Sequence, residues 1–110
     1  MSLKAADLAE TLAFQLRAVG LKDFEREFRF HPLRKWRFDI CFPRERLAAE
    51  VDGGLYISGR HSRGASQEKD YDKHNAAVVL GWRLLKFGPN HIKSGTALKV
   101  VEDALMTRAA

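Results

Sequence analysis

The sequence is poor in cysteine and contains no long apolar run. One cysteine among 110 residues excludes an internal disulfide framework and a zinc site built from several cysteines, and we expect Cys41 to fill space in a strand. No apolar stretch approaches the roughly 18 residues of a membrane span, and the N-terminal segment lacks the basic start and apolar core of a signal peptide. We therefore expect a cytoplasmic protein with no membrane partner.

Repeats, low-complexity tracts and linkers are also missing, so we expect residues 1–110 to form one domain. Hydrophobic residues make up 45% and charged residues 30%, which is typical of a chain that folds around a core. Lysine and arginine outnumber aspartate and glutamate by 19 to 14, and no part of the chain is a basic tail. The net charge of +5 favours a polyanionic partner such as nucleic acid without requiring one.

Hydrophobic periodicity predicts the element order αβββαβα. The expected helices cover 3–19, about 66–80 and about 94–107, and the expected strands cover 25–31, 35–42, about 46–52 and 82–87. A Gly-rich polar loop is expected over 53–65. This order predicts a mixed four-stranded sheet flanked by helices, which is an α/β or α+β layer fold.

Three acids lie in the stretch "RFDICFPRERLAAEVDGG", where a core would be expected. Strict alternation places Phe38 and Ile40 on one face of the second strand and Asp39 on the other. In the third strand, alternation places Glu50 and Asp52 opposite the apolar side chains. We therefore expect the three acids to share the polar faces of neighbouring antiparallel strands.

Clustered carboxylates repel one another, and burial raises that cost unless a cation or basic side chains offset it. Oxygen ligands without histidine or cysteine suit a hard cation, Mg²⁺ above all with Mn²⁺ as a substitute, and such an ion can activate water against a phosphodiester. The alternative is that Glu50 and Asp52 lie at the exposed end of a strand and pair with arginines. The arginines in question are Arg37, Arg44 and Arg46.

"RFDICF", followed by "EVDGG" eleven residues after Asp39, resembles the motif region of the PD-(D/E)XK, or restriction-endonuclease-like, nuclease superfamily. The αβββαβ core order is also the superfamily's order. Over roughly residues 8 to 88, the chain resembles small phage and prophage members related to the very-short-patch-repair endonuclease. The resemblance implies that Asp39 and Glu50 bind the metal and that Glu10 adds an acid near it.

The same resemblance implies a Mg²⁺-dependent endodeoxyribonuclease that acts on double-stranded or branched DNA in a bacterial host cell, in DNA repair or recombination. Nicking and Holliday-junction resolution are both open. The superfamily pattern has a lysine two residues after the glutamate, where this chain has Asp52. Either Asp52 adds a metal ligand or a water-mediated contact, or a lysine of the second helix takes that role. We favour Lys73 over Lys69 because small residues that would pack on the sheet follow it; the alternative is a solvated charged face.

Basic residues near these motifs suggest contacts with a nucleic-acid backbone. The candidates are Arg34, Lys35, Arg37, Arg60, Arg63 and Lys69. Within "SGRHSRG", glycines would let the loop approach a backbone closely, and His61 would act as a general base or assist the leaving group. For each of these residues a plain surface role is the alternative.

Two classes of function remain open. The first is a nuclease or nickase, which we also consider as a homodimer because a chain of this size offers limited surface for a duplex. The second is a non-catalytic nucleic-acid-binding module that keeps the nuclease fold but has lost turnover because Asp52 stands in place of the lysine.

Overall fold

The helices and strands follow the predicted order, with one additional helix. The computed structural model describes residues 5–53 and 59–107, apart from the side chains at 5, 59–64 and 66. Its elements are α1 (Ala5–Ala18), β1 (Glu25–Arg29), β2 (Arg37–Phe42), β3 (Leu47–Val51), α2 (Gly59–Val79), β4 (Arg83–Phe87), α3 (Pro89–Lys93) and α4 (Thr96–Met106). The short helix α3 was not predicted, and it starts at a proline, which is favoured in the first turn of a helix.

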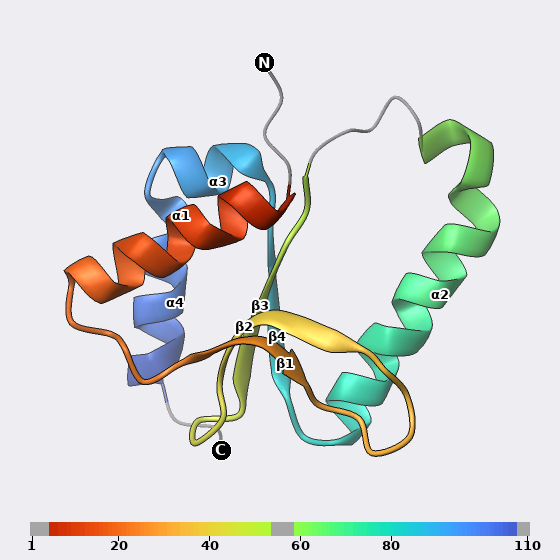
Figure 1. The fold of residues 1–110 in the computed structure, drawn as a ribbon, viewed down its shortest axis with the longest axis horizontal. Helices are drawn as coiled ribbons and strands as arrows, with labels where there is room; N and C mark the ends of the chain where they lie inside the picture. The colour runs from red at the N-terminus through yellow and green to blue at the C-terminus, as the bar shows by residue number, and fades with distance from the viewer. Residues whose placement is uncertain (1–4, 54–58, 108–110) are drawn as a thin grey trace.

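The four strands form one mixed sheet in the order β1-β2-β3-β4. The β1/β2 and β2/β3 pairs are antiparallel, whereas β3 and β4 are parallel and are connected through α2. Helices α1, α3 and α4 lie on one side of the sheet and α2 lies on the other (Figure 1). The predicted fold class is therefore confirmed. No helix in the described ranges is long and apolar enough to cross a bilayer.

The first core lies between the sheet and the helices α1, α3 and α4. Leu8, Leu12 and Leu16 recur at helical spacing on α1 and are fully buried. The main residues of the first core are Leu8, Leu12, Leu16, Ile40, Phe42, Leu47, Ala49, Val51, Phe87, Ile92, Ala97 and Val101. Helices α3 and α4 complete this core, so all three helices cover the same face of the sheet.

The second core lies on the opposite face of the sheet, under the C-terminal part of α2. It consists of Phe30, Phe38, Cys41, Ala48, Ala77 and Trp82. The Phe38 ring stacks on Phe30 with 4.0 Å between ring centroids, and Trp82 packs at 5.0 Å from Phe38. Helices therefore cover both faces of the central strands, which explains why these strands are apolar on both sides.

Helix α2 begins at Gly59, well before the predicted start near residue 66. The prediction of a loop through residue 65 is therefore wrong over 59–65, while 54–58 lie outside the described residues. From 67 to 72 every side chain is exposed, so no apolar periodicity marks this part of the helix. Glycines that suggested a loop are tolerated inside a helix at about 1 kcal/mol each.

The side-chain alternation of β1 and β2 changes phase at two facing residues, Glu27 and Asp39. The ladder pairs the residues on either side of them, and Glu27 has a φ of 52°. Ile40 packs in the first core whereas Phe38 packs in the second, so the prediction that they share a face is wrong. Both faces of β2 are buried. The break in alternation at Asp39 places Phe38 in the second core and Ile40 in the first, although the two residues are only two positions apart. Irregularities of this kind are frequent beside functional sites.

Cys41 is fully buried in the second core, which confirms its predicted packing role. Burial raises the pKa of the Cys41 thiol to about 12, so almost no reactive thiolate forms near neutral pH. We expect no reaction of the native protein with a thiol reagent such as DTNB, and one labelled thiol per chain in urea. Rapid labelling of the native protein would contradict this burial.

Candidate active site

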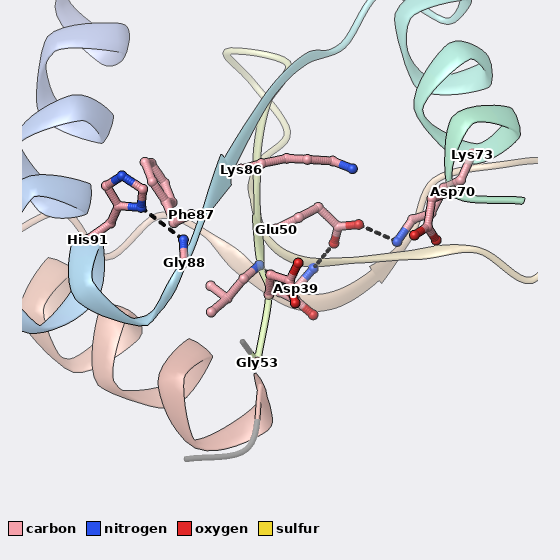
Figure 2. A pocket seen from close by; sticks show the side chains of 11 residues that line it. Asp39, Glu50, Gly53, Asp70, Lys73, Lys86, Phe87, Gly88 and His91 are labelled. Carbon is pink, nitrogen blue, oxygen red and sulfur yellow. Dashed lines mark hydrogen bonds and ion pairs between the residues drawn. The ribbon is translucent and has the colours of Figure 1, made fainter. Parts of the chain in front are cut away.

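An open cleft of about 540 Å³ lies where the parallel strands β3 and β4 end, between the sheet and α2. Charged residues from β2, β3, β4 and α2 line it: Asp39, Glu50, Asp52, Asp70, Lys73 and Lys86. Ligands bind outside the carboxyl ends of parallel strands in many open α/β sheets. The cleft is therefore the candidate site, and it contains Asp39 and Glu50, the two acids predicted as the main metal ligands (Figure 2).

Asp39 and Glu50 are held by reciprocal hydrogen bonds between β2 and β3. Val51 donates its backbone N–H to Asp39 Oδ2 at 2.7 Å, and Asp39 donates its own backbone N–H to Glu50 Oε2 at 3.1 Å. The regular ladder ends one residue earlier, at the pair Ile40 and Ala49. The two carboxylates thus accept backbone N–H groups where the ladder would otherwise continue, and these bonds hold them at this end of the β2/β3 ladder.

Lys73 reaches across from α2 and forms an ion pair with Glu50 Oε1. The Glu50 side chain is 17% exposed and the Lys73 side chain 22%, so the pair is largely desolvated. The alternative that Glu50 pairs with an arginine at an exposed strand end is wrong. Arg46, for example, donates to the Leu80 carbonyl and lies over the Trp82 ring.

Burial raises the pKa of both Asp39 and Glu50. For Asp39, the hydrogen bond from Val51 opposes this increase and the nearby charge of Glu27 adds to it. For Glu50, the hydrogen bond and charge of Lys73 oppose the increase, and the charge of Asp39 adds to it. The cleft therefore holds two carboxylates that are costly to ionise without a further cation.

We expect the buried charge of Asp39 to lower stability in the absence of divalent ions. A carboxyl with a raised pKa binds its proton more tightly in the folded than in the unfolded chain, so its stabilising contribution is present at acid pH and is lost as the pH rises through the raised pKa. Asp39→Asn keeps an oxygen that can accept from Val51 and removes the charge. We expect it to raise the free energy of unfolding by about 1 kcal/mol at neutral pH.

Urea unfolding in EDTA measures this difference. The gain should shrink as the pH falls toward the ordinary pKa of a carboxyl, because the raised pKa of Asp39 lets the folded wild type take up this proton before the unfolded chain does. A loss of stability on Asp39→Asn at neutral pH would show that the hydrogen bond outweighs the burial cost.

The donor set of the cleft suits a small, hard cation. Asp39 Oδ1 accepts no hydrogen bond from the described residues, and Glu50 offers Oε1, which otherwise faces Lys73. No group of three or more histidine, cysteine, aspartate or glutamate side chains among the described residues has the geometry of a metal site. Mg²⁺ commonly takes only one or two protein carboxylates and fills its other positions with water and phosphate oxygens. Asp39 and Glu50 therefore fit this ion as ligands.

Glu10, predicted as a further metal ligand, does not line the cleft. Its exposed carboxylate forms ion pairs with Arg17 and Arg26. Arg26 in turn donates from Nε to the backbone carbonyl of Asp39 at 3.1 Å. Glu10 is thus linked to the backbone of Asp39 through an arginine, on the side of the sheet where α1 lies.

Asp52 lies at the end of β3 and lines the cleft, as the sequence predicted. Its backbone N–H donates to the Phe87 carbonyl at 2.8 Å, which ties the exit of β3 to β4. Lys69 is exposed on α2 and does not line the cleft, whereas its neighbour Asp70 does. Of the two candidate lysines on α2, the structure therefore brings only Lys73 to the acids.

Arg60, His61 and Arg63 belong to the first two turns of α2, and their side chains lie outside the described part of the structure. The argument that Gly59 and Gly64 let a loop approach a nucleic-acid backbone does not apply, because this segment is helical. Their predicted roles as general base and phosphate contacts stay predictions.

Arg34, Lys35 and Arg37 are exposed at the turn from β1 to β2 and at the start of β2. Arg34 packs its guanidinium over the Trp36 ring at 4.1 Å and accepts a hydrogen bond from Arg29 at its carbonyl. None of the three lines the cleft. The three residues are exposed and basic, and Arg37 lies on the same strand as Asp39.

Sequence reasoning missed Lys86, Asp70 and His91 as residues of the cleft. Lys86 lies on β4 and Asp70 lies on α2. Only the parallel register of β3 and β4 brings Lys86 beside Glu50. His91 accepts a hydrogen bond from the Gly88 backbone N–H at its Nδ1, which shapes the turn into α3.

Comparisons of the chain with family models, curated proteins and solved structures found no match. The resemblance to the PD-(D/E)XK superfamily therefore remains a hypothesis, carried by the motif residues and by the chemistry of the cleft.

Proposed function

We propose that this protein is a Mg²⁺-dependent DNA endonuclease whose active site is the cleft at the ends of β3 and β4. The observation that carries the proposal is the pair Asp39 and Glu50. Each carboxylate accepts a backbone N–H from the strand of the other, and both line the cleft. The motifs "RFDICF" and "EVDGG" contribute these two acids. A net charge of +5 on the chain supports a polyanionic substrate.

Asp39 and Glu50 would hold the ion, which supplies Lewis-acid stabilisation of a phosphoryl group and a water of lowered pKa. Lys73 keeps Glu50 in place through its ion pair. The wide opening of the cleft leaves room for a phosphodiester backbone. Arg34, Lys35 and Arg37 would contact phosphates farther along the DNA and orient it without reading its sequence.

A nicking assay tests the proposal. Purified protein is incubated with supercoiled plasmid in Mg²⁺, in Mn²⁺ and in EDTA, and then with mismatched, flapped, four-way-junction and single-stranded substrates. We expect conversion to nicked circles that requires the metal and stops in EDTA. Preference for the junction would identify a resolvase within the same class.

Binding of DNA without cleavage under every metal would instead favour the non-catalytic module. Asp52 is the specific observation behind that second function, because a carboxylate cannot supply the positive charge of the lysine it replaces. Mn²⁺ binding, followed by thermal shift, separates an inactive module that still binds metal from a protein with no metal site.

A further inference from the structure

Lys86 is the second cation of the cleft. It lies on β4 as the ladder partner of Glu50 on the parallel strand β3. Partners in a ladder project their side chains from the same face of the sheet, so Lys86 and Glu50 both face the side of α2. Figure 2 shows Lys86 extended above the Glu50 side chain in the direction of α2. The cleft thus has one lysine from each wall.

The two lysines differ in what already binds them. Lys73 is largely buried, and its ammonium is committed to Glu50. Lys86 is exposed, and it forms no ion pair or side-chain hydrogen bond with the residues that the structure describes. Lys86 is therefore available to an anion from outside the protein, whereas Lys73 is not available without releasing Glu50.

The charge of the cleft leaves a role for such a cation. Four carboxylates and two ammonium groups line it, which gives −2 before any ion binds. One divalent cation at Asp39 and Glu50 brings the lining to neutrality, and a phosphodiester then adds a negative charge. An ammonium on a flexible stem donates up to three hydrogen bonds and accommodates phosphate oxygens without strict geometry.

We propose that Lys86 contacts the phosphate at, or next to, the scissile bond of the DNA. This inference rests on the proposed function, and it assigns the task of substrate contact to β4 instead of to α2. Lys73 keeps the separate task of holding Glu50.

The test compares Lys86→Gln, Lys86→Arg and the control Lys22→Gln, which removes an equal charge from an exposed position outside the cleft. We expect Lys86→Gln to weaken DNA binding and to lower kcat/KM about 10- to 100-fold, as loss of a charged hydrogen bond does. The negative slope of log affinity against log salt concentration should become shallower by about 0.9. Lys86→Arg should restore most of the loss, and Lys22→Gln should change little.

Mn²⁺ affinity, followed by the thermal shift of the protein alone, keeps the two proposals apart. We expect Lys86→Gln to bind Mn²⁺ as the wild type does. If the wild type cleaves DNA and Lys86→Gln behaves like Lys22→Gln, the role of Lys86 is overturned and the proposed function stands. If the wild type binds neither Mn²⁺ nor DNA, the proposed function fails and the role of Lys86 fails with it.

Discussion

Asp39→Ala and Glu50→Ala are each expected to reduce Mg²⁺-dependent nicking by about 1,000-fold or more. The ion supplies several kcal/mol of transition-state stabilisation, and each 1.36 kcal/mol corresponds to about a factor of ten in rate. Under the proposed function, removal of either carboxylate would take one of two protein ligands from the ion, since both residues line the cleft. The double variant should then be little worse than either single variant, because both residues would serve one ion.

Controls separate chemistry from folding in this experiment. Asp39→Asn and Glu50→Gln keep oxygen acceptors for the backbone N–H groups of Val51 and Asp39, and both should be folded and inactive. Asp72→Asn removes an exposed acid of α2 that does not line the cleft, and it should retain activity. Nicking that persists in both alanine variants would place the chemistry elsewhere.

Phe38→Ala is expected to lower the free energy of unfolding by about 3–5 kcal/mol. The Phe38 ring is fully buried, and it joins the Phe30 ring to the Trp82 ring in the second core. Domains of this size have a total stability of about 5–15 kcal/mol, so the variant should be partly unfolded near 37 °C. Because Phe38 precedes Asp39 where β2 breaks its alternation, the substitution should also disorder the cleft.

Urea denaturation followed by tryptophan fluorescence measures this effect. Phe38→Leu keeps most of the apolar volume and should cost less than about 1.5 kcal/mol. Leu33→Ala in the neighbouring turn serves as the control, because Leu33 is 84% exposed and its truncation should stay within about 0.5 kcal/mol. A Phe38→Ala variant as stable as Leu33→Ala would contradict the packing of the second core.

The element order could be predicted because most helices and strands bury one face and leave a periodic pattern. Leu8, Leu12 and Leu16 show this for α1. In α2 the side chains from 67 to 72 are all exposed, so this part of the helix left no periodic signal in the sequence. For α3, a segment of five residues is too short to show a period at all.

The meeting of Asp39 and Glu50 was predicted correctly, although part of the reasoning was wrong. The antiparallel register that pairs Ile40 with Ala49 places the next residues, Asp39 and Glu50, side by side. Simple alternation also predicted a polar face, whereas both faces of β2 are buried. The alternation changes phase at Asp39, so Phe38 packs in the second core and Ile40 in the first.

Lys86 shows what sequence reasoning could not reach. The sequence "WRLLKF" reads as a core strand, and its lysine gains significance only through a parallel partner that lies far away in the sequence. Pairing between β3 and β4 depends on how α2 crosses the sheet, and local periodicity does not specify that pairing.

The central claim is that Asp39 and Glu50 together hold a divalent cation, and a crystal structure of the protein with Mn²⁺ tests it most directly. Anomalous scattering locates the ion without reference to activity. The account predicts an ion in the cleft, within about 2.0–2.3 Å of one carboxylate oxygen from each of the two residues. Saturating Mn²⁺ bound only at other acids, with no ion between Asp39 and Glu50, would contradict the account.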